Sequence, residues 1–332
     1  MSKKRNRRGL VAHTAAAMLL AATVHASADE QISFNMAWLP QGSVVGPIVA
    51  KEKGWFNDAG LDVELSRGYG GSRTANEVDQ GMFTIGYVDP INVALNRQNG
   101  GTLRMVGAIN GIWPAGVCYV KQGLDDQRGI DDIIGLKMGG GAASPVHKIM
   151  PAWLEMNGRA PDAISLLRLE PAVVDASLLE GRIDLAECWR ASNRAVLQKL
   201  AEKAGKQIGW IEYSDHGLNA YGSGFATTEA AIAEKPGALR AFLDASYRGY
   251  EFAIENPEDA AEIILAAYPS LDPEITLQQV REVVSLLAPR GKLEPAFEAE
   301  RIGGTYELIT SAFGLSHEAV TADDLFTNEL VE

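Results

Sequence analysis

The chain has 332 residues, of which 46% are hydrophobic and 22% are charged, and its formal net charge is −13 at pH 7. This length suits one large or two medium domains, and the hydrophobic content suffices for a core without disulfide or metal staples. The acidic balance argues against nucleic acid and anionic membranes as main partners, although a cleft can still attract an anion locally.

The first 28 residues have the organisation of a secretory signal peptide. Five basic residues lie within positions 3–8, an apolar stretch follows at 9–24, and Ala26-Ser27-Ala28 supplies the small residues needed for cleavage. The apolar stretch is short for a spanning helix, so export is favoured over a permanent anchor. Arg7-Arg8 leaves the twin-arginine route open beside the Sec route. We therefore expect a periplasmic protein.

Short apolar runs then alternate with helical patterns. We predict strands at 32–38, 62–65, 83–87 and 103–109, with helices at 44–53, 73–80 and 91–98. This alternation is typical of βαβ units, which form a mostly parallel sheet with helices on both faces.

A second unit of the same kind begins near residue 116. Its predicted strands are 118–120, 136–139, 165–169, 183–188 and 208–213, and its predicted helices are 145–156, 172–179 and 194–204. A strand at 221–227 follows, and residues 228–332 have an almost entirely helical pattern. Two α/β units without a flexible linker predict domains joined by several crossings of the chain, with a ligand cleft between them.

The two cysteines, Cys118 and Cys188, lie in apolar, strand-like runs. Export would permit a bond between them, but buried free thiols are the state that these runs favour.

Three loops combine glycine and serine ahead of a predicted helix. They are Gly42-Ser43, Gly70-Gly71-Ser72, and Gly139-Gly140-Gly141 followed by Ser144-Pro145. Glycine lets the backbone approach a ligand, serine caps the helix, and the free N–H groups can hold an anionic or carbonyl oxygen. Plain capping explains any single loop. Three loops at the ends of successive strands favour a binding site.

Aromatic and charged residues also gather at the strand ends. Trp38, Tyr87, Trp113 and Trp189 would form either lids on the core or a stacking slot for a flat group. Asp89 could bind ligand or simply cap the helix that starts at Pro90. Glu187 lies in a buried-looking strand, where a carboxylate needs a partner, either Arg190 or a donor from the ligand.

Catalytic and metal-binding patterns are absent from the sequence. His147, His216 and His317 are widely separated, and no Cys-x-x-Cys, His-x-x-x-His or Gly-x-Ser-x-Gly motif is present in the chain. An acidic neighbour raises the pKa of a thiol, so Cys188 beside Glu187 is a poor nucleophile. We expect no enzyme activity, no metal and no cofactor.

Several segments resemble one known family. They are Trp38-Leu39-Pro40-Gln41, residues 50–56 (AKEKGWF), residues 60–64 (GLDVE), Gly70-Gly71-Ser72, residues 85–89 (IGYVD), residues 181–184 (GRID) and Asn256-Pro257-Glu258. Together they resemble the NMT1/THI5-like substrate-binding proteins of ABC transporters, which include the nitrate, sulfonate and taurine (SsuA/TauA-like) members. The resemblance extends over essentially the whole chain after residue 28.

The resemblance implies a two-lobed periplasmic binding protein fold (type II-like). Each lobe would hold a mixed, mostly parallel sheet flanked by helices, and the C-terminal region would be helical. Lobe 1 would comprise residues 29–114 plus 222–332, and lobe 2 residues 115–221. Such a protein works as a monomer that closes on a small molecule by a hinge motion and then docks on an ABC permease in the inner membrane.

The pocket implied by the resemblance consists of Trp38, Gly71, Ser72, Asp89, Ser144, Glu187 and Trp189. Gln41, Tyr87, Trp113 and Arg190 complete the candidate ligand-binding set from the patterns described above. Many relatives of the sulfonate branch carry an acid where this chain has Arg190, so the charge pattern of the ligand can differ.

The resemblance leaves the ligand open among sulfonates, pyrimidine precursors and aromatic acids. The aromatic strand ends favour a flat organic molecule over nitrate, and Arg190 with the glycine-serine loops favours an anionic or carbonyl end. Two alternatives remain: a pyrimidine-biosynthesis-type enzyme that uses His147 or His216, and a periplasmic sensor. The cysteine cluster of the eukaryotic pyrimidine-forming members is absent here, which argues against the enzyme.

Overall fold

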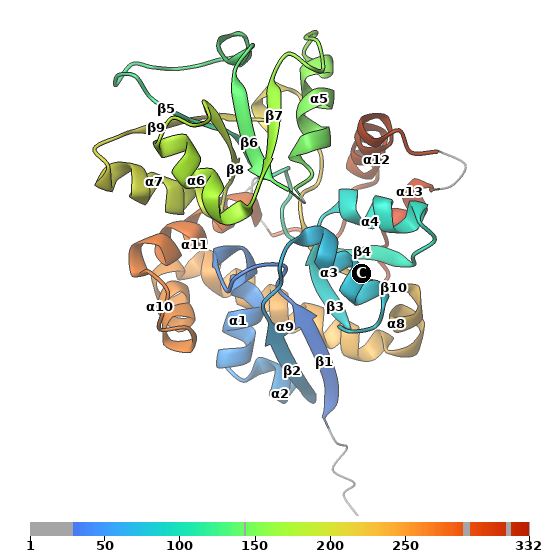
Figure 1. Ribbon diagram of the computed structural model, residues 1–332. Helices are drawn as coiled ribbons and strands as arrows, with labels where there is room; N and C mark the ends of the chain where they lie inside the picture. Colours follow the sequence, from blue (N-terminus) through green and yellow to red (C-terminus); the bar gives the residue numbers. More distant parts are fainter. Residues whose placement is uncertain (1–28, 143, 288–292, 317–319, 332) are drawn as a thin grey trace, which may run out of the picture.

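The computed structural model describes residues 29–142, 144–287, 293–316 and 320–331, so the proposed signal peptide at 1–28 lies outside the described residues. Its helices and strands are arranged around two five-stranded sheets, one in the lower half and one in the upper half of Figure 1. We refer to the two halves as the first and second lobes. The expected α/β class with two sheets is confirmed.

The first sheet has the strand order β2-β1-β3-β10-β4. Its strands are β1 (Glu30–Asn35), β2 (Leu61–Ser66), β3 (Ile85–Val88), β4 (Leu103–Ala108) and β10 (Gly224–Thr228). β1 pairs in parallel with β2 and β3, whereas β10 runs antiparallel to β3 and β4. The alternation read from the sequence is visible in β1, where Ile32 and Phe34 are buried.

The second sheet repeats this plan with the order β7-β6-β8-β5-β9. Its strands are β5 (Ala115–Val120), β6 (Lys137–Gly141), β7 (Ser165–Leu169), β8 (Leu185–Trp189) and β9 (Ile208–Glu212). β6 is parallel to β7 and β8, and β5 is the antiparallel strand. Each sheet therefore contains one antiparallel strand, next to its edge, that lies directly before or after a crossing between the lobes.

Helices cover the faces of both sheets. In the first lobe they are α1 (Val45–Glu52, preceded by the 3-10 turn Gly42–Val44), α2 (Trp55–Asp58), α3 (Gly71–Asp79) and α4 (Pro90–Gln98); in the second they are α5 (Val146–Met156), α6 (Pro171–Leu179) and α7 (Asn193–Lys203), with 3-10 turns at Ile130–Ile133 and Ser214–His216. None of the helices among the described residues is both long and apolar enough to span a bilayer.

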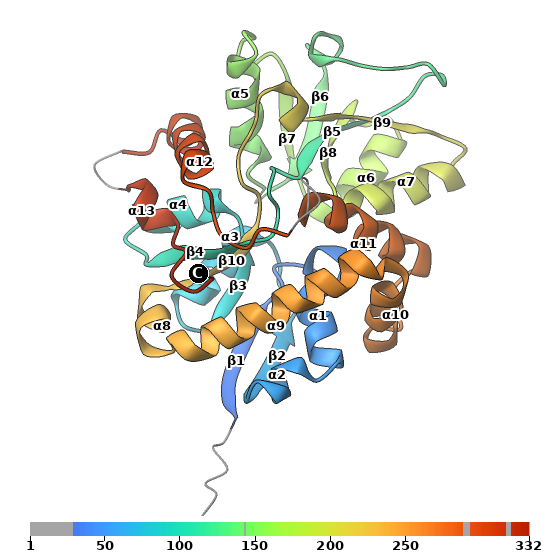
Figure 2. The same cartoon turned by 180° about the vertical axis from the view of Figure 1, so that it is seen from behind.

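The C-terminal part is helical, as predicted. It contains α8 (Glu229–Glu234), α9 (Pro236–Glu255), α10 (Pro257–Ala267), α11 (Pro273–Leu287), α12 (Ala299–Phe313) and α13 (Ala322–Leu325). Proline begins α9, α10 and α11, a position where its missing N–H costs no hydrogen bond. The long α9 runs across the back of the first lobe (Figure 2), and α12 contacts helices of both lobes, α4 and α5.

The expectation of two free thiols is wrong. Cys118 and Cys188 form a disulfide between β5 and β8, with their Cα atoms 5.5 Å apart. The register pairs Cys118 with Ala186 and Gly116 with Cys188, so the two cysteines lie diagonally across neighbouring antiparallel strands. This separation is within the range that a disulfide requires. The sequence does not show that strands 70 residues apart are neighbours.

Candidate functional site

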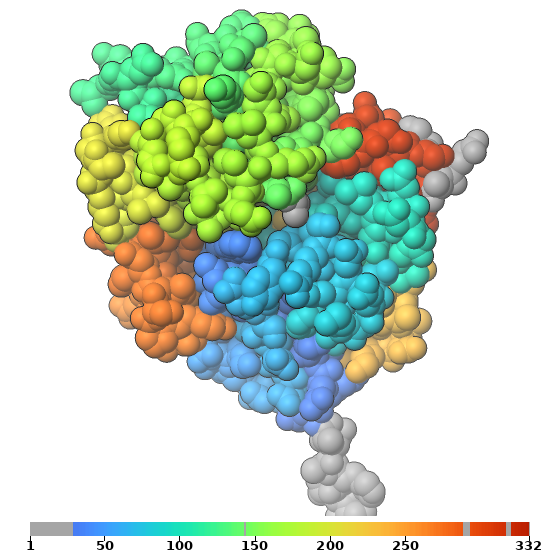
Figure 3. Space-filling model, viewed as in Figure 1, coloured from blue at the N-terminus to red at the C-terminus, as the bar shows by residue number. Residues whose placement is uncertain are grey.

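A cavity of about 290 Å³ opens between the lobes, where the carboxyl ends of their parallel strands meet. Figure 3 shows the two lobes in contact along the boundary between them. Nine of the predicted site residues line the cavity: Trp38, Gln41, Gly71, Tyr87, Asp89, Ser144, Glu187, Trp189 and Arg190. Ser72 and Trp113 do not line it.

The two exceptions have other surroundings. Ser72, in the first turn of α3, lines a separate crevice between α3 and α4. Trp113 is 2% exposed and packs its ring 5.7 Å from that of Trp189, so it supports the wall of the cavity from behind. The interpretation of Trp113 as a lid on the core therefore describes its position better than a stacking surface does.

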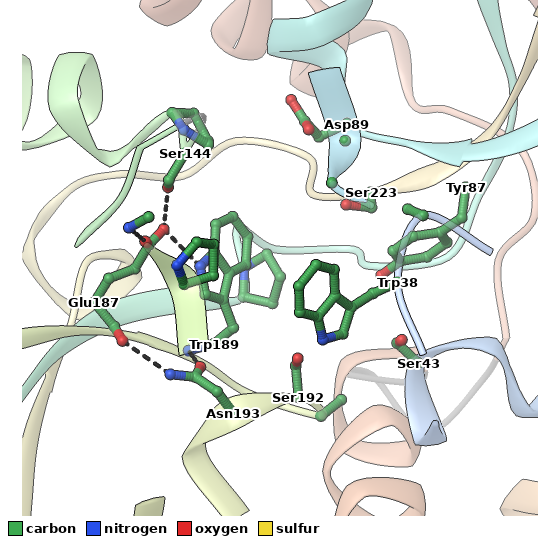
Figure 4. Close-up of a pocket in the computed structure, with 18 of the residues that line it drawn as sticks. Trp38, Ser43, Tyr87, Asp89, Ser144, Glu187, Trp189, Ser192, Asn193 and Ser223 are labelled. Carbon is green, nitrogen blue, oxygen red and sulfur yellow. Dashed lines mark hydrogen bonds between the residues drawn. The ribbon is translucent and has the colours of Figure 1, made fainter. Parts of the chain in front are cut away.

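Two tryptophans approach each other from opposite lobes (Figure 4). Trp38 follows β1, and Trp189 ends β8. Each stands near a non-glycine residue with a left-handed backbone, Ala37 with φ 61° and Ala191 with φ 52°. These are the two non-glycine residues with positive φ in the described part of the chain, and both line the cavity. Strain of this kind persists where the surrounding structure fixes it, often at a functional site.

Backbone contacts hold the Trp38 loop in place. The amide of Ala37 donates to Oδ1 of Asn35 at 2.9 Å, and the carbonyl of Ala37 accepts from the amide of Gly70 at 2.8 Å. Gly68 donates to the carbonyl of Trp38 at 3.1 Å. The loop after β1 and the glycine loop after β2 thus form one rigid wall.

Glu187 is buried on the second-lobe side of the cavity. It accepts hydrogen bonds from the hydroxyl of Ser144, from Nε1 of Trp189 at 2.6 Å, and from the amide of Gly141 at 3.2 Å. Burial raises the pKa of Glu187, and these hydrogen bonds offset only part of that rise. The partner of Glu187 is therefore a set of neutral donors.

Arg190 does not pair with Glu187. Of the two partners considered for this acid in the sequence, Arg190 is therefore wrong. Its Nε donates to Glu282 of α11 at 3.0 Å, and its Nη2 donates to Ser285 at 2.6 Å. Arg190 directly follows β8, and its guanidinium reaches α11 on the other side of the gap between the lobes. Although Arg190 lines the cavity, its charge is balanced across the gap between the lobes.

Asp89 caps α4, as one interpretation of the sequence proposed. Its Oδ1 accepts from the amide of Asn92 at 3.0 Å and its Oδ2 from the side-chain amide of Asn92 at 2.5 Å. Burial raises the pKa of Asp89 despite these bonds. A Cβ atom on Gly71 would lie 3.1 Å from Oδ2 of Asp89, so the carboxylate also lies beside the start of α3.

A serine hydroxyl bonds to the first turn of only one of the three helices, α5, whose N-cap residue is Pro145 rather than Ser144. The hydroxyl of Ser144 accepts from the amide of Val146 at 3.2 Å in the first turn of α5. No side chain caps α1 or α3, where the preceding residues are Val44 and Gly70. Ser43 accepts instead from Nε2 of Gln41 at 3.0 Å. The expectation of serine caps is thus wrong for the first two loops, because both serines lie inside the turns that they were expected to start.

Tyr87 and Asn110 form a polar pair on the first-lobe side. Nδ2 of Asn110 donates to the hydroxyl of Tyr87 at 2.8 Å. Burial raises the pKa of Tyr87 to about 12, so the hydroxyl stays protonated. Oδ1 of Asn110 is buried and has no donor among the described residues.

Asp175 of α6 and Asn193 of α7 were not predicted as site residues, although both line the cavity. Nδ2 of Asn193 donates to Asp175 at 3.2 Å and to the carbonyl of Glu187 at 3.1 Å. Burial raises the pKa of Asp175 to about 6. A single acid in the otherwise apolar helix 171–179 was the signal that could have identified it.

Four further lining residues belong to the three glycine-serine loops: Ser43, Gly70, Gly141 and Pro145. The lining residues that no sequence pattern indicated are Ala37, Tyr69, Asn92, Asn110, Pro114, Pro171, Val174, Ala191, Ser192 and Ser223. Neither His147 nor His216 lines the cavity, and Nε2 of His147 lies 3.0 Å from the carbonyl oxygen of Gly141. No group of three or more potential metal ligands occurs within the described ranges.

Comparisons with known proteins agree with this geometry. A formylaminopyrimidine-binding protein of Halalkalibacterium halodurans is 22% identical over 260 residues, which cover 78% of this chain and 77% of that protein. The ligand-binding component of an ABC-type import system from Staphylococcus aureus, solved with zinc bound, has a TM-score of 0.69 at 14% identity and covers 91% of this chain and 97% of that one.

The alkanesulfonate-binding protein SsuA from Xanthomonas axonopodis pv. citri, solved with MOPS, has a TM-score of 0.68 at 14% identity, with 91% of this chain and 100% of that chain covered. At such identities the likeness shows the shared fold, and the predicted two-lobed periplasmic binding protein fold is thereby confirmed. The model of the family described as NMT1/THI5 like matches residues 41–260. The chain therefore belongs to the NMT1/THI5-like family.

Proposed function

We propose that this chain is the periplasmic solute-binding component of an ABC importer. It captures a small, flat, polar organic molecule between its lobes and delivers it to a permease in the inner membrane. The observation that carries this proposal is the cavity itself, which receives aromatic and polar side chains from both lobes. Cavities of this size and composition are typical small-molecule sites.

The proposal assigns residues 29–114 and 222–332 to one lobe and residues 115–221 to the other. It is supported by the distribution of the strands, because those of the first sheet fall in the first set and those of the second sheet fall in the second. The connections at 109–114 and 213–223 then act as the hinge. Hinge closure would bring Trp38 and Trp189 onto the two faces of a flat ligand.

Export and delivery complete the proposal. Residues 1–28 direct the chain to the periplasm, where the disulfide between Cys118 and Cys188 can form and persist. The mature monomer binds its solute there and docks on the permease. The import system of the Staphylococcus aureus structure provides the analogy for this partner.

Ligand capture can be tested without knowing the ligand. The protein is exported from its own host, and native mass spectrometry identifies any co-purified molecule before and after mild denaturation and refolding. A panel of sulfonates, pyrimidines and aromatic acids then identifies compounds that raise the melting temperature. Small-angle scattering should show a smaller radius of gyration with ligand. No bound molecule, no thermal shift and no compaction would together refute the proposal.

A pair of tryptophan variants tests the location of binding. Trp38→Ala should weaken binding about tenfold or more, because it removes one face of the slot. Trp210→Ala is the matched control, since Trp210 is 38% exposed on β9 and does not line the cavity. Equal losses of affinity in both variants would place the ligand elsewhere.

A further inference from the structure

The charged side chains that line the cavity are unequal in sign. They comprise three carboxylates, Asp89, Asp175 and Glu187, and one cation, Arg190. The guanidinium of Arg190 is already balanced by Glu282. Arg73, near the mouth beside Tyr69, is likewise paired with Glu77 at 2.6 Å. By residue type the lining therefore contains more acids than cations, although the guanidinium of Arg67 lies over the rings of Tyr69 and Trp38, 4.5 Å and 6.0 Å from their centroids.

Three of the helix starts beside the cavity, those of α3, α4 and α5, already lie next to carboxylates of the protein. The amide of Gly141 and the hydroxyl of Ser144, ahead of α5, both donate to Glu187. Asp89 caps α4 and lies beside the start of α3 at Gly71. These positive dipole ends therefore stabilise acids of the protein, and an anionic ligand would have to displace or approach those acids.

Two acceptors on residues that line the cavity have one donor or none. Oδ1 of Asn110 is buried without a donor among the described residues, and Asn110 is 2% exposed. Asp175 accepts one hydrogen bond, from the side-chain amide of Asn193, and this donor is neutral. A carboxylate can accept several hydrogen bonds, and Asp175 lines the cavity with one donor from the protein, so a ligand donor would be stabilised there.

We propose that the ligand is a small organic cation, in which a flat ring carries a protonated nitrogen group that donates to Asp175. Trp38 and Trp189 enclose the ring, and their π faces favour a delocalised positive charge. This inference rests on the proposed function and specifies the charge of its ligand. It replaces the anionic end that Arg190 and the glycine-serine loops suggested in the sequence.

Three probes of nearly the same shape test the sign of the charge. Benzamidine is a cation at pH 7.5, benzamide is neutral and benzoate is an anion, and all three carry a planar group on one ring. Titration calorimetry of refolded, ligand-free protein should show benzamidine binding about tenfold or more tightly than benzamide, with benzoate weakest. Tighter binding of benzoate or benzamide would overturn the inference and leave ligand capture standing.

Variants of Asp175 test the residue. Asp175→Asn should weaken benzamidine binding about tenfold and benzamide binding much less, because only the cation loses a charge-assisted hydrogen bond, and Asp175→Glu should restore part of the benzamidine affinity. Asp162→Asn, at an exposed position of the same lobe outside the cavity, is the matched control. Unchanged benzamidine affinity in Asp175→Asn would overturn the assignment of this carboxylate.

If none of the three probes binds, the charge of the co-purified molecule tests the inference. A cation found by native mass spectrometry supports the inference, whereas a neutral or anionic molecule refutes it while the proposed function stands. The absence of any bound molecule, together with lobes that do not close on the broader panel, refutes the proposed function itself. The two failures are thus distinguishable.

Discussion

Lys199 of α7 contacts Asp272, the residue before α11, with its Nζ atom 2.6 Å from Oδ1 and 2.8 Å from Oδ2. This ion pair joins the second lobe to the first, as does the pair formed by Arg190 and Glu282 further along α11. Gln278 donates to Gln198 across the same gap at 3.0 Å. The contacts between α7 and α11 thus hold the lobes together in the arrangement of Figure 1.

We expect Lys199→Gln to increase the fraction of open molecules and to weaken ligand binding about two- to threefold, because partly exposed pairs contribute modestly. Scattering without ligand should give a larger radius of gyration, and calorimetry should give the affinity. Arg281→Gln is the matched control, since Arg281 pairs at 2.6 Å with Glu258 inside the first lobe. A radius that changes equally in both variants would contradict the role of Lys199.

Glu187→Gln should weaken both binding and folding. Three donors converge on the Glu187 carboxylate, and an amide can offer only one acceptor atom, so its NH₂ group would face a donor. We expect the free energy of unfolding to fall by about 1–3 kcal/mol in urea titrations. Glu155→Gln, an exposed position on α5, should change it little. Unchanged stability in Glu187→Gln would mean that the three hydrogen bonds contribute little to folding.

Removal of the disulfide should destabilise the protein strongly. Cys118 and Cys188 close a loop with a sequence separation of 70. The chain-entropy model gives a loss of about 4 kcal/mol for a loop of this length. Cys118→Ala combined with Cys188→Ala should lower the unfolding midpoint in urea by the corresponding amount. A reductant should lower the midpoint of the wild-type protein and leave the double variant unchanged; a midpoint insensitive to reductant in both would contradict the assignment.

Gly249 of α9 allows α1 to approach closely. A Cβ atom on Gly249 would lie 2.8 Å from the carbonyl carbon of Gly46, so Gly249→Ala must separate the two helices. We expect a loss of about 1–3 kcal/mol in unfolding free energy. Gly303→Ala in α12 is the matched control, because a Cβ atom there meets nothing within 4 Å. That change should stabilise the protein by up to about 1 kcal/mol through helix propensity, and equal effects of both changes would contradict the close approach.

Much of the fold could be predicted because local patterns determine it. The alternation around Ile32 and Phe34 identified β1, and the helical pattern of residues 228–332 identified the helical C-terminal region. The strand ends then located most of the candidate site, since parallel strands bring their carboxyl ends to one edge. Trp38, Asp89, Glu187 and Trp189 line one cavity although 151 residues separate the first from the last.

The remaining features depend on contacts between distant segments. The pairing of β5 with β8 brings the two cysteines within bonding distance. The packing of α11 against α7 brings Glu282 next to Arg190. Nothing near either residue in the sequence specifies these neighbours. Asp175 was missed for the same reason, because a helix pattern does not show which polar position faces a cavity.

The pKa of Asp175 leads to a prediction about pH. Burial raises this pKa from 3.8 to about 6, and the groups that face Asp175 are Asn193 of α7 and the acid Glu187 of β8. The native state thus holds a proton that the unfolded chain releases between pH 4 and 6, so the contribution of Asp175 to stability is largest below pH 4 and falls as the pH rises to 6. Binding of benzamidine should change in the opposite sense, because the cation needs the ionised carboxylate.

Calorimetry from pH 5 to 8 should therefore show benzamidine affinity increasing through pH 6 in the wild-type protein, whereas the affinity of Asp175→Asn stays flat. Urea titrations from pH 4 to 7 should show a wild-type unfolding free energy that decreases more steeply than that of Asp175→Asn. The variant keeps a residual slope from other acids whose pKa values burial also raises, namely Glu187, Asp89 and Glu212. Parallel pH profiles in the two proteins would show that Asp175 titrates outside this range and does not hold the cation.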